Sequence, residues 1–479
     1  RGLGDVYKRQ ILERTDWCIS RQRRWGLPIP VFYCKDCGKP ICTEESIEAV
    51  ASLFEKKGSN AWFDMEAEDI LPQGFTCPHC GKQAGFEKET DTLDGWFDSG
   101  STHFAAMERD QGFWPATMYI EGLDQYRGWF QSSLLVAVGA LGRGAPFKEC
   151  VTHGWTVDGE GKAMHKSLGN AVSPDEVIKD YGADMLRLWV ASADYTQDMR
   201  ISKDIMKQLS QAYLKIRNTA RYILGNLYDF HPDTDSVSDD QLQELDRWAL
   251  ARMDQVASEC RKAYDNFEFH LVYYAIRNFC TIYLSNFYLD IIKDRLYCEE
   301  RNGLKRRSAQ TALFLILDSM TKMFAPILAF TCDEIWLAMP HKAGDDDRNV
   351  LFNDMNGVFA DYALSADEMA KWEKIIEVRD AVNGALETAR AEKKIGKSLE
   401  AAVELTVPAE DAFLAEMDEE YLADLFIVSQ VHVTVGEALA VQVSEAKGEK
   451  CERCWKHHVK VGSDANHPTL CRRCAQLFS

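Results

Sequence analysis

The sequence has no apolar run long enough to cross a bilayer. Its most apolar stretch, Leu134 to Leu141, is far shorter than the roughly 20 residues that a membrane helix needs. The apolar run from Ala312 to Phe330 is interrupted by Asp318 and Lys322. No signal peptide precedes the fifteen cysteines, which are odd in number and scattered. We therefore expect no membrane partner, and a reducing, cytoplasmic compartment rather than a disulfide scaffold.

Basic residues are too few for a protein that coats nucleic acid along its whole surface. The chain has 55 Lys and Arg against 75 Asp and Glu, which gives a net charge of −20 at pH 7. Only local basic patches remain available to bind a polyanion. One such patch lies between Lys447 and Ser479, where seven basic and three acidic residues give a net charge of +4.

An initiator methionine is also absent. The first ten residues, RGLGDVYKRQ, continue into no recognisable pattern, and we interpret them as a non-native scar. On this interpretation the chain is a piece whose native N-terminal part is missing. Its 479 residues, 46% of them hydrophobic, are enough for about three or four domains with substantial cores. No internal repeat is found.

Four cysteines near the C-terminus have the spacing of one tetrahedral zinc site. Cys451 and Cys454 form one C-x-x-C pair, and sixteen residues separate them from the second pair, Cys471 and Cys474. Four thiolates leave no open coordination position, so the metal would fold the tail rather than perform chemistry. The alternative is a set of scattered thiols on a solvated charged segment.

A second set of paired cysteines lies in an insertion near the N-terminus. Cys34 and Cys37 are separated from Cys77 and Cys80 by 39 residues, which include a helical pattern from Glu44 to Glu55. A glycine follows each pair and permits the tight turn of a zinc-binding loop. Because the separation exceeds that of compact zinc fingers, a second zinc site and paired free thiols both remain open. We predict one or two Zn²⁺ ions per chain.

The periodicity of apolar residues changes after Ile201. From Thr92 to Ala193, short apolar strands such as MYI and ECVTHGW alternate with helical segments, which predicts an α/β region with buried strands. After Ile201, apolar residues recur every three or four positions over about 140 residues and predict a helical bundle. The aromatic residues of NFEFHLVYYAIRNF are expected in its core, with a base-stacking platform as the alternative. A charged helix and the strands AVELTV and QVHVTV follow.

Polar side chains gather at two places in the α/β region. In TDTLDGWFDSGSTHF, three aspartates (Asp91, Asp94 and Asp98) surround Trp96. In YIEGLDQYRGWF, a short apolar strand ends at Glu121, and Asp124 and Gln125 follow it. Open α/β sheets bind ligands at the carboxyl ends of their strands, so these groups are candidate ligand contacts. Acid-rich turns of this kind also serve as ordinary helix caps.

A third segment, WTVDGEGKAMHKSLGN, has the composition of a phosphate-binding loop. It is rich in glycine and carries Lys162, Lys166, Ser167 and Asn170. Backbone N–H groups and an ammonium in such a loop can hold phosphates. A plain surface turn is the alternative.

In chain order, DWCISRQRRWGLPIP, DGWFDSGSTH, EGLDQYRGWF, KAMHKSLGN and GADMLRLWVASADY resemble the second half of class I aminoacyl-tRNA synthetases. The set is most similar to the isoleucyl-tRNA synthetases, although valyl and leucyl enzymes share parts of it. The resemblance covers residues 11 to 479. It implies ATP-dependent ligation of L-isoleucine to isoleucine tRNA through an isoleucyl-adenylate, by a monomer that uses Mg²⁺ with ATP.

The resemblance also assigns roles to individual residues. It implies that the isoleucyl-adenylate is held by Glu121, Gly122, Asp124 and Gln125, and that the apolar slot for isoleucine is lined by Trp96 and Trp129. Lys166 would contact the ATP phosphates and act in catalysis together with Ser167. The zinc ligands would be Cys451, Cys454, Cys471 and Cys474, with Cys34, Cys37, Cys77 and Cys80 as a second set.

The implied fold class is multidomain, α/β plus α, with a partial Rossmann-like catalytic core, a helical anticodon-binding bundle and a small zinc-binding domain. The expected segments are a scar at 1–10, catalytic core at 11–33 and 91–200, a cysteine-bearing insertion at 34–90, the bundle at 201–345, a junction at 346–445 and a Cys₄ domain at 446–479.

The chain departs from the family pattern at several positions. Ala163 and His165 stand where the phosphate loop usually has lysine and serine, and Gly95 replaces a larger apolar residue. The H-x-G-H element and the editing insertion are not found, so we expect the chain alone to be catalytically silent. A non-catalytic zinc-dependent tRNA-binding module and a synthetase of valine specificity are the alternative functions.

Overall fold

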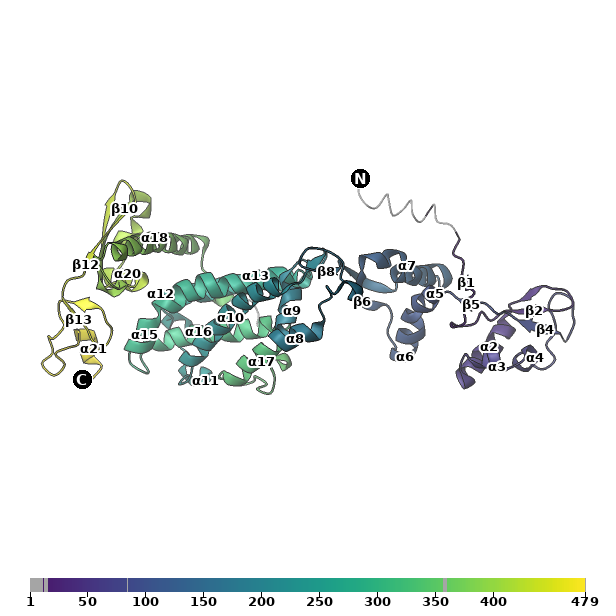
Figure 1. The fold of residues 1–479 in the computed structure, drawn as a ribbon. Helices are drawn as coiled ribbons and strands as arrows, with labels where there is room; N and C mark the ends of the chain where they lie inside the picture. Colours follow the sequence, from purple (N-terminus) through teal and green to yellow (C-terminus); the bar gives the residue numbers. More distant parts are fainter. Residues whose placement is uncertain (1–11, 13–15, 84, 356–359, 479) are drawn as a thin grey trace. The chain divides into compact units, whose positions relative to one another are not determined.

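The computed structural model describes residue 12 and residues 16–83, 85–355 and 360–478 (Figure 1). The predicted scar at 1–10 therefore lies outside the described residues. The chain divides into two compact units, Arg1–Trp155 and Thr156–Ser479, and each is considered by itself. Within the described ranges, no helix has both the length and the apolar character required to cross a membrane.

The first unit contains a small subdomain that carries the first cysteine set. A three-stranded antiparallel sheet, ordered β3-β2-β4, is formed by β2 (Phe32–Cys34), β3 (Pro40–Ile41) and β4 (Phe86–Lys88). Three helices follow β3, namely α2 (Glu44–Lys57), α3 (Ala61–Asp64) and α4 (Ala67–Ile70). The hydroxyl of Thr43 caps α2 by accepting a hydrogen bond from the Ser46 N–H at 3.2 Å, and the predicted helix is confirmed. Phe32 and Trp62 lie in the subdomain's own buried core.

The rest of the first unit is a short parallel ribbon with helices. Strand β6 (Ala116–Gly122) pairs in parallel with β7 (Phe147–His153). The remaining elements are β1 (Ser20–Arg21) paired with β5 (Thr92–Leu93), and α5 (Gly95–Gly100), η1 (His103–Glu108), α6 (Arg109–Gln111), η2 (Leu123–Arg127), α7 (Trp129–Leu134) and η3 (Leu135–Ala140). The expectation of buried strands is wrong for β7, which has no fully buried residue. In the described part of this unit, β6 is its only strand partner, so β7 is covered along one edge alone.

The second unit begins with a segment that packs into the helical bundle. Strand β8 (Thr156–Val157) pairs in parallel with β9 (Met199–Arg200). Between them lie η4 (Lys166–Leu168), α8 (Pro174–Tyr181) and α9 (Ala183–Ser192). Leu188 and Trp189 of α9 belong to the same continuous core as the bundle helices. Residues 156–200 are therefore joined to the bundle through shared apolar packing.

The predicted helical bundle is present. Its elements are α10 (Lys203–Asn226), α11 (Pro232–Asp235), η5 (Asp239–Gln241), α12 (Glu244–Asp265), α13 (Phe269–Asn278), η6 (Phe279–Tyr288), α14 (Leu289–Ile291), α15 (Lys293–Cys298), α16 (Leu304–Phe324) and α17 (Ala329–Ala338). Ser202 caps α10, and the predicted apolar stripe of this helix is buried from Leu209 to Ile223. Helix α16 is buried on almost every face, and its Asp318 and Lys322 pair with each other at 2.9 Å.

Two helical stretches of the bundle are interrupted. The run around Pro326 divides into α16 and α17 because proline cannot continue the hydrogen-bond ladder. The run from Trp248 onward breaks at Phe267, which has a positive φ of 58° between α12 and α13. Of the aromatic segment that follows, Tyr273 and Phe279 are buried, as predicted for core residues, whereas Tyr274 is 45% exposed, so the prediction is wrong for that residue.

The chain ends in a small α/β layer and the cysteine tail. Helix α18 (Ala366–Ala391) starts at a capping box formed by Ser365 and Glu368. Strand β10 (Ala401–Pro408) lies between β11 (Gln430–Gly436), to which it is parallel, and the antiparallel β12 (Ala440–Glu445). The smaller elements are η7 (Val350–Phe352), η8 (Ala360–Tyr362), η9 (Ser398–Glu400), η10 (Ala409–Asp411), α19 (Phe413–Glu416), α20 (Glu419–Phe426), β13 (Glu449–Lys450), β14 (His457–His458) and α21 (Arg472–Gln476).

Candidate functional site

The end of strand β6 carries the predicted adenylate contacts. Glu121 lies opposite Thr152 of β7, and the strand ends at Gly122. The chain then turns into η2, where Gln125 donates a hydrogen bond from Nε2 to Asp124 Oδ2 at 2.9 Å. Gln125 Oε1 accepts from the backbone N–H of Trp129 at 3.2 Å. Glu121, Asp124 and Gln125 are thus grouped at the carboxyl end of a parallel strand, where open α/β sheets bind ligands.

Trp129 is fixed in position by three contacts. Its ring stacks on buried Tyr119, with centroids 4.2 Å apart and planes inclined by 4°. Its indole N–H donates to the carbonyl of Ser99 at 2.9 Å. Its backbone N–H is held by Gln125. A ring that is held in this way offers a rigid apolar wall to a small ligand.

Trp96 lies at the start of α5, and a buried aspartate anchors this helix end. Asp94 caps α5 by accepting from the Trp96 N–H at 3.3 Å. The same carboxylate accepts from the Trp17 indole at 2.9 Å and from the Arg21 guanidinium at 2.7 Å. The Trp96 side chain is 44% exposed. Asp94 therefore links strand β1 to the helix end that presents Trp96.

Gly128 allows Trp96 and Gln125 to approach the start of α7. A Cβ at this position would lie 2.7 Å from Gln125 Oε1 and 2.8 Å from the Trp96 ring. Both distances are shorter than real Cβ contacts, so any side chain here would push the two residues apart. By contrast, a Cβ at Gly95 would meet nothing within 4 Å. The surroundings of Gly95 would therefore also accept a Cβ, and no close contact requires glycine at this position.

Asp98, the third aspartate near Trp96, has one carboxylate oxygen in a buried position. Its Oδ1 atom is buried without a hydrogen-bond donor among the described residues. Burial, together with the neighbouring Asp94 charge, raises the pKa of Asp98 above its ordinary value. The remaining aspartate of this segment, Asp91, accepts a hydrogen bond from Gln22 at 2.7 Å.

The predicted phosphate loop lies in the second unit and is held by two polar side chains. Asp158 accepts from the backbone N–H groups of Glu160 and Lys162 at 3.0 and 2.9 Å, and from the Asn170 amide at 2.9 Å. The Lys162 N–H and the Asn170 amide hold the pKa of Asp158 below its ordinary value. Asn170 also accepts from the His165 N–H at 3.0 Å. Both ends of the loop are therefore tied together.

The two lysines of this loop differ in their partners. The Lys162 ammonium forms an exposed ion pair with Glu160 at 2.7 Å. Lys166 is exposed at the start of η4, and in the described part of the chain its ammonium has no ion-pair partner. Ser167 is exposed beside it. Lys166 is therefore the lysine that is free to contact an incoming anion.

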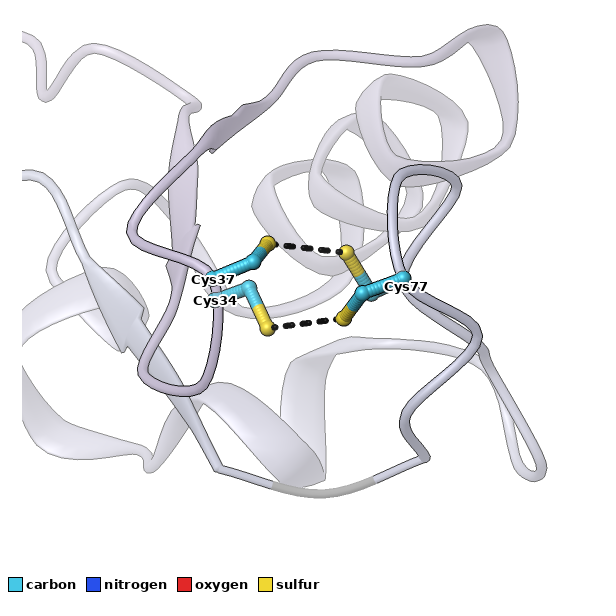
Figure 2. Close-up of side chains that lie close together, drawn as sticks. Cys34, Cys37 and Cys77 are labelled. Atoms are coloured by element: carbon cyan, nitrogen blue, oxygen red, sulfur yellow. Dashed lines mark hydrogen bonds between the residues drawn. The ribbon is translucent and has the colours of Figure 1, made fainter.

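The N-terminal cysteines come together as one cluster (Figure 2). Cys34 and Cys80 have sulfurs 3.7 Å apart, and Cys37 and Cys77 have sulfurs 3.8 Å apart. A disulfide would require about 2.05 Å, whereas tetrahedral Zn–S bonds of about 2.3 Å place sulfurs about 3.8 Å apart. The four sulfurs lie within 4.8 Å of one another, and the donor set fits Zn²⁺.

The C-terminal cysteines form a second cluster of the same kind. Cys451, Cys454, Cys471 and Cys474 are all buried, with sulfurs within 4.8 Å of one another. The Cys451 sulfur accepts from the backbone N–H of Cys471 at 3.3 Å. A hydrogen bond from Cys474 lowers the pKa of Cys454, and the same hydrogen bond raises the pKa of Cys474. Four buried sulfurs grouped at this separation also fit a closed zinc site.

The C-terminal cluster is attached to the helical bundle. Arg473 donates two hydrogen bonds to Asp294 of α15, at 2.5 and 2.8 Å. Cys298 at the end of the same helix packs among the four cysteines. Lys456 pairs with Asp424 of α20. The tail is therefore docked on its neighbours through charged contacts.

Three family models match successive parts of the chain. The model described as "tRNA synthetases class I (I, L, M and V)" matches residues 4–202. The model "Anticodon-binding domain of tRNA ligase" matches residues 246–405, and "Zinc finger found in FPG and IleRS" matches residues 448–477. Together they follow the order of strand-end site, helical bundle and cysteine tail.

The similar curated proteins share one name. The isoleucine–tRNA ligase of Syntrophotalea carbinolica is 50% identical over 100% of this chain and 52% of its own length. That of Caldanaerobacter subterraneus subsp. tengcongensis is 49% identical over 97% of this chain and 51% of its own. Over its whole length the chain is thus similar to isoleucine–tRNA ligases. It spans about half the length of these relatives.

A solved structure supports the fold assignment. A crystal structure of the LeuRS of Agrobacterium radiobacter K84, in a ternary complex with tRNA and LeuAMS, matches with a TM-score of 0.51 at 17% identity. The match covers 90% of this chain and 46% of that one. The predicted resemblance to isoleucyl-tRNA synthetases and the predicted fold class are both confirmed.

Several positioning residues were missed by the sequence interpretation. Asp158 could have been found, because Asp-Gly-x-Gly after a strand is a turn signal. Gly128 and Asp294 carry no local signal, since each acts on residues distant in sequence. The roles assigned to the strand-end residues and to Lys166 and Ser167 stay predictions.

Proposed function

We propose that this chain is part of an isoleucine–tRNA ligase, which joins L-isoleucine to isoleucine tRNA by way of an isoleucyl-adenylate. The proposal is carried chiefly by the 50% identity to a curated isoleucine–tRNA ligase along the whole of this chain. Support also comes from the grouping of carboxylate, amide and tryptophan side chains at the end of β6. The protein would act as a cytoplasmic monomer.

The reaction divides into two group transfers. The isoleucine carboxylate attacks the α-phosphorus of ATP, which forms a carboxyl-phosphate bond and releases pyrophosphate. A ribose hydroxyl of the tRNA then attacks the carbonyl carbon and releases AMP. Mg²⁺ bound with ATP would neutralise phosphate charge. Catalysis of this type rests on positioning and on charge stabilisation rather than on a covalent enzyme intermediate.

The strand-end residues suit the binding of the adenylate. Glu121 and Asp124 supply carboxylates for the ammonium and ribose hydroxyls, while Gln125 supplies an amide and Gly122 lets the backbone come close. Trp96 and Trp129 would form the apolar walls around the isoleucine side chain. Their geometry is supported by Asp94 and Gly128.

Lys166 and Ser167 would act on the phosphates. In an intact enzyme that carries this segment, we expect Lys166→Ala to lower isoleucine-dependent pyrophosphate exchange by about 10² or more, because a transition-state charge contact is lost. Lys162→Ala is the matched control, and its effect should be smaller because Glu160 already pairs with Lys162. A larger loss from Lys162→Ala would show that the wrong lysine has been assigned.

The helical bundle and the zinc-binding tail would bind tRNA. We expect this chain to bind isoleucine tRNA more tightly than an unrelated tRNA, with affinity falling steeply between about 50 and 200 mM salt because phosphate contacts release counterions. Fluorescence anisotropy with labelled tRNA measures both effects. Equal binding of the two tRNAs, or no binding, would contradict the proposal.

A further inference from the structure

The glycine-rich loop of the second unit begins beside strand β9, which carries Arg200. In the parallel pair of β8 and β9, Val157 lies opposite Arg200, and its carbonyl accepts from the Ile201 N–H at 3.0 Å. On its other side, Val157 forms an antiparallel bridge with Ala163. Neighbouring strands lie about 4.8 Å apart, so Ala163 is only about two strand spacings from Arg200. The turn between Val157 and Ala163 is therefore within reach of a long side chain on β9.

Two glycines allow this turn to approach the side chains of β9. A Cβ added at Gly159 would lie 3.0 Å from the Cβ of Ser202. A Cβ added at Gly161 would lie 3.3 Å from Nη2 and 3.6 Å from Cζ of Arg200. Gly161 also has a φ of 84°, a conformation that residues with a side chain rarely adopt. The Arg200 guanidinium therefore lies against the backbone of the loop itself.

The charge of Arg200 is not used within the fold. The residue is exposed, and in the described part of the chain its guanidinium has neither a hydrogen-bond acceptor nor an ion-pair partner. The two acids of the turn are engaged by other groups. Asp158 accepts from two backbone N–H groups and from Asn170, while Glu160 pairs with Lys162. A guanidinium is thus held on this loop with its donors available to a ligand.

The chemistry of this group suits a phosphate ligand. A guanidinium is planar and always charged, and its fork of N–H donors matches two oxygens of one phosphate. Lys166, the lysine of the same loop that has no ion-pair partner in the described residues, offers a single point charge instead. The loop therefore presents two different cations to an anion.

We propose that Arg200 is a further substrate-binding residue, whose guanidinium holds two oxygens of the pyrophosphate that leaves ATP. The inference rests on the proposed function and adds one residue to its active site. In the first transfer, an oxygen of the isoleucine carboxylate forms a bond to the α-phosphorus. The bond from that phosphorus to the bridging oxygen of pyrophosphate breaks, and its electron pair stays on pyrophosphate. The guanidinium would stabilise the charge that develops there.

Substitutions in an intact enzyme that carries this segment test the contact. We expect Arg200→Ala to lower kcat for isoleucine-dependent pyrophosphate exchange by about 10²–10³-fold, the usual loss for one donor to a developing charge. The KM for pyrophosphate should rise, whereas the KM for isoleucine should not change. Arg200→Lys should keep part of the rate, because it retains a charge and loses the fork. Arg217→Ala, on an exposed arginine of α10, is the matched control and should leave the exchange unchanged.

Hydrogen exchange on the present chain separates ligand binding from support of the loop. Since Arg200 supplies no hydrogen bond to the loop among the described residues, residues 158–170 should exchange at the wild-type rate in Arg200→Ala. Asp158→Ala should speed exchange in the same segment, because Asp158 ties the Glu160 and Lys162 N–H groups and Asn170 together. This variant shows that the measurement detects a loosened loop.

Three results would overturn the inference. If the intact enzyme is active and Arg200→Ala exchanges pyrophosphate as fast as the wild type, the phosphate contact is wrong while the proposed function stands. Faster hydrogen exchange in 158–170 of Arg200→Ala, with a raised KM for isoleucine, would make Arg200 a support of the loop rather than a ligand of pyrophosphate. If the wild-type intact enzyme shows no isoleucine-dependent exchange, the proposed function fails and this inference fails with it.

Discussion

Purified protein should contain two zinc ions per chain, and Cys451→Ser and Cys77→Ser should each remove one. Each serine breaks a closed set of four sulfurs that lie within 4.8 Å of one another. Binding of zinc to such sites is worth about 10–16 kcal/mol, and this free energy is coupled to folding. Metal analysis by plasma mass spectrometry gives the stoichiometry.

The two substitutions should also act on different regions. Hydrogen exchange should rise after about Lys447 in Cys451→Ser and within 34–90 in Cys77→Ser, with the bundle protected in both. Cys150→Ser is the control, because Cys150 is an exposed thiol outside both clusters, and it should keep two zinc ions. One zinc ion per wild-type chain, lost in Cys451→Ser and kept in Cys77→Ser, would eliminate the N-terminal site.

Replacing Asp246 by alanine should lower the free energy of unfolding of the bundle by about 3–5 kcal/mol, the usual cost of leaving one member of a buried ion pair without its partner. Asp246 is fully buried and accepts two hydrogen bonds from Arg295, both at 2.8 Å. It also accepts from the Tyr288 hydroxyl at 2.7 Å and from the Ser308 hydroxyl at 2.5 Å. The substitution would leave the partly buried Arg295 guanidinium and the hydroxyls of Tyr288 and Ser308 without this acceptor.

Urea unfolding followed by tryptophan fluorescence measures this loss. The matched control is Glu377→Ala, which breaks an exposed i,i+3 pair with Lys374 and should cost less than about 1 kcal/mol. Asp246→Asn should lie between the two, since it keeps an acceptor and loses the charge. A cost below about 1 kcal/mol for Asp246→Ala would mean that water replaces the carboxylate.

Features that depend on residues close in sequence were predictable. Both cysteine clusters are built from C-x-x-C turns, whose spacing predicted the C-terminal zinc site and left the N-terminal set open between a second zinc site and paired free thiols. The end of β6 was visible as an apolar stretch followed by Glu121 and Asp124. The stripe on α10 followed from helical periodicity. In each of these cases the structure places the residues as their local sequence pattern predicted.

Features that depend on contacts between distant residues were not predictable. Gly128 matters because Trp96, thirty-two positions earlier, packs against it. Asp246 and Arg295 are forty-nine residues apart, and neither has a sequence signal for burial. The exposure of β7 is set by how many strands surround it rather than by its apolar composition. The positive φ of Trp455, 64°, has no signal in the sequence either.

Two adjacent residues of helix α15 form ion pairs with different parts of the second unit. Asp294 holds Arg473 of the tail, and Arg295 holds Asp246 of the core. The tail therefore depends on α15, whereas α15 has an anchor of its own in the core. In amide hydrogen exchange, the free energy of local opening should therefore be lower for the tail than for α15. Helix α15 should open only together with the bundle.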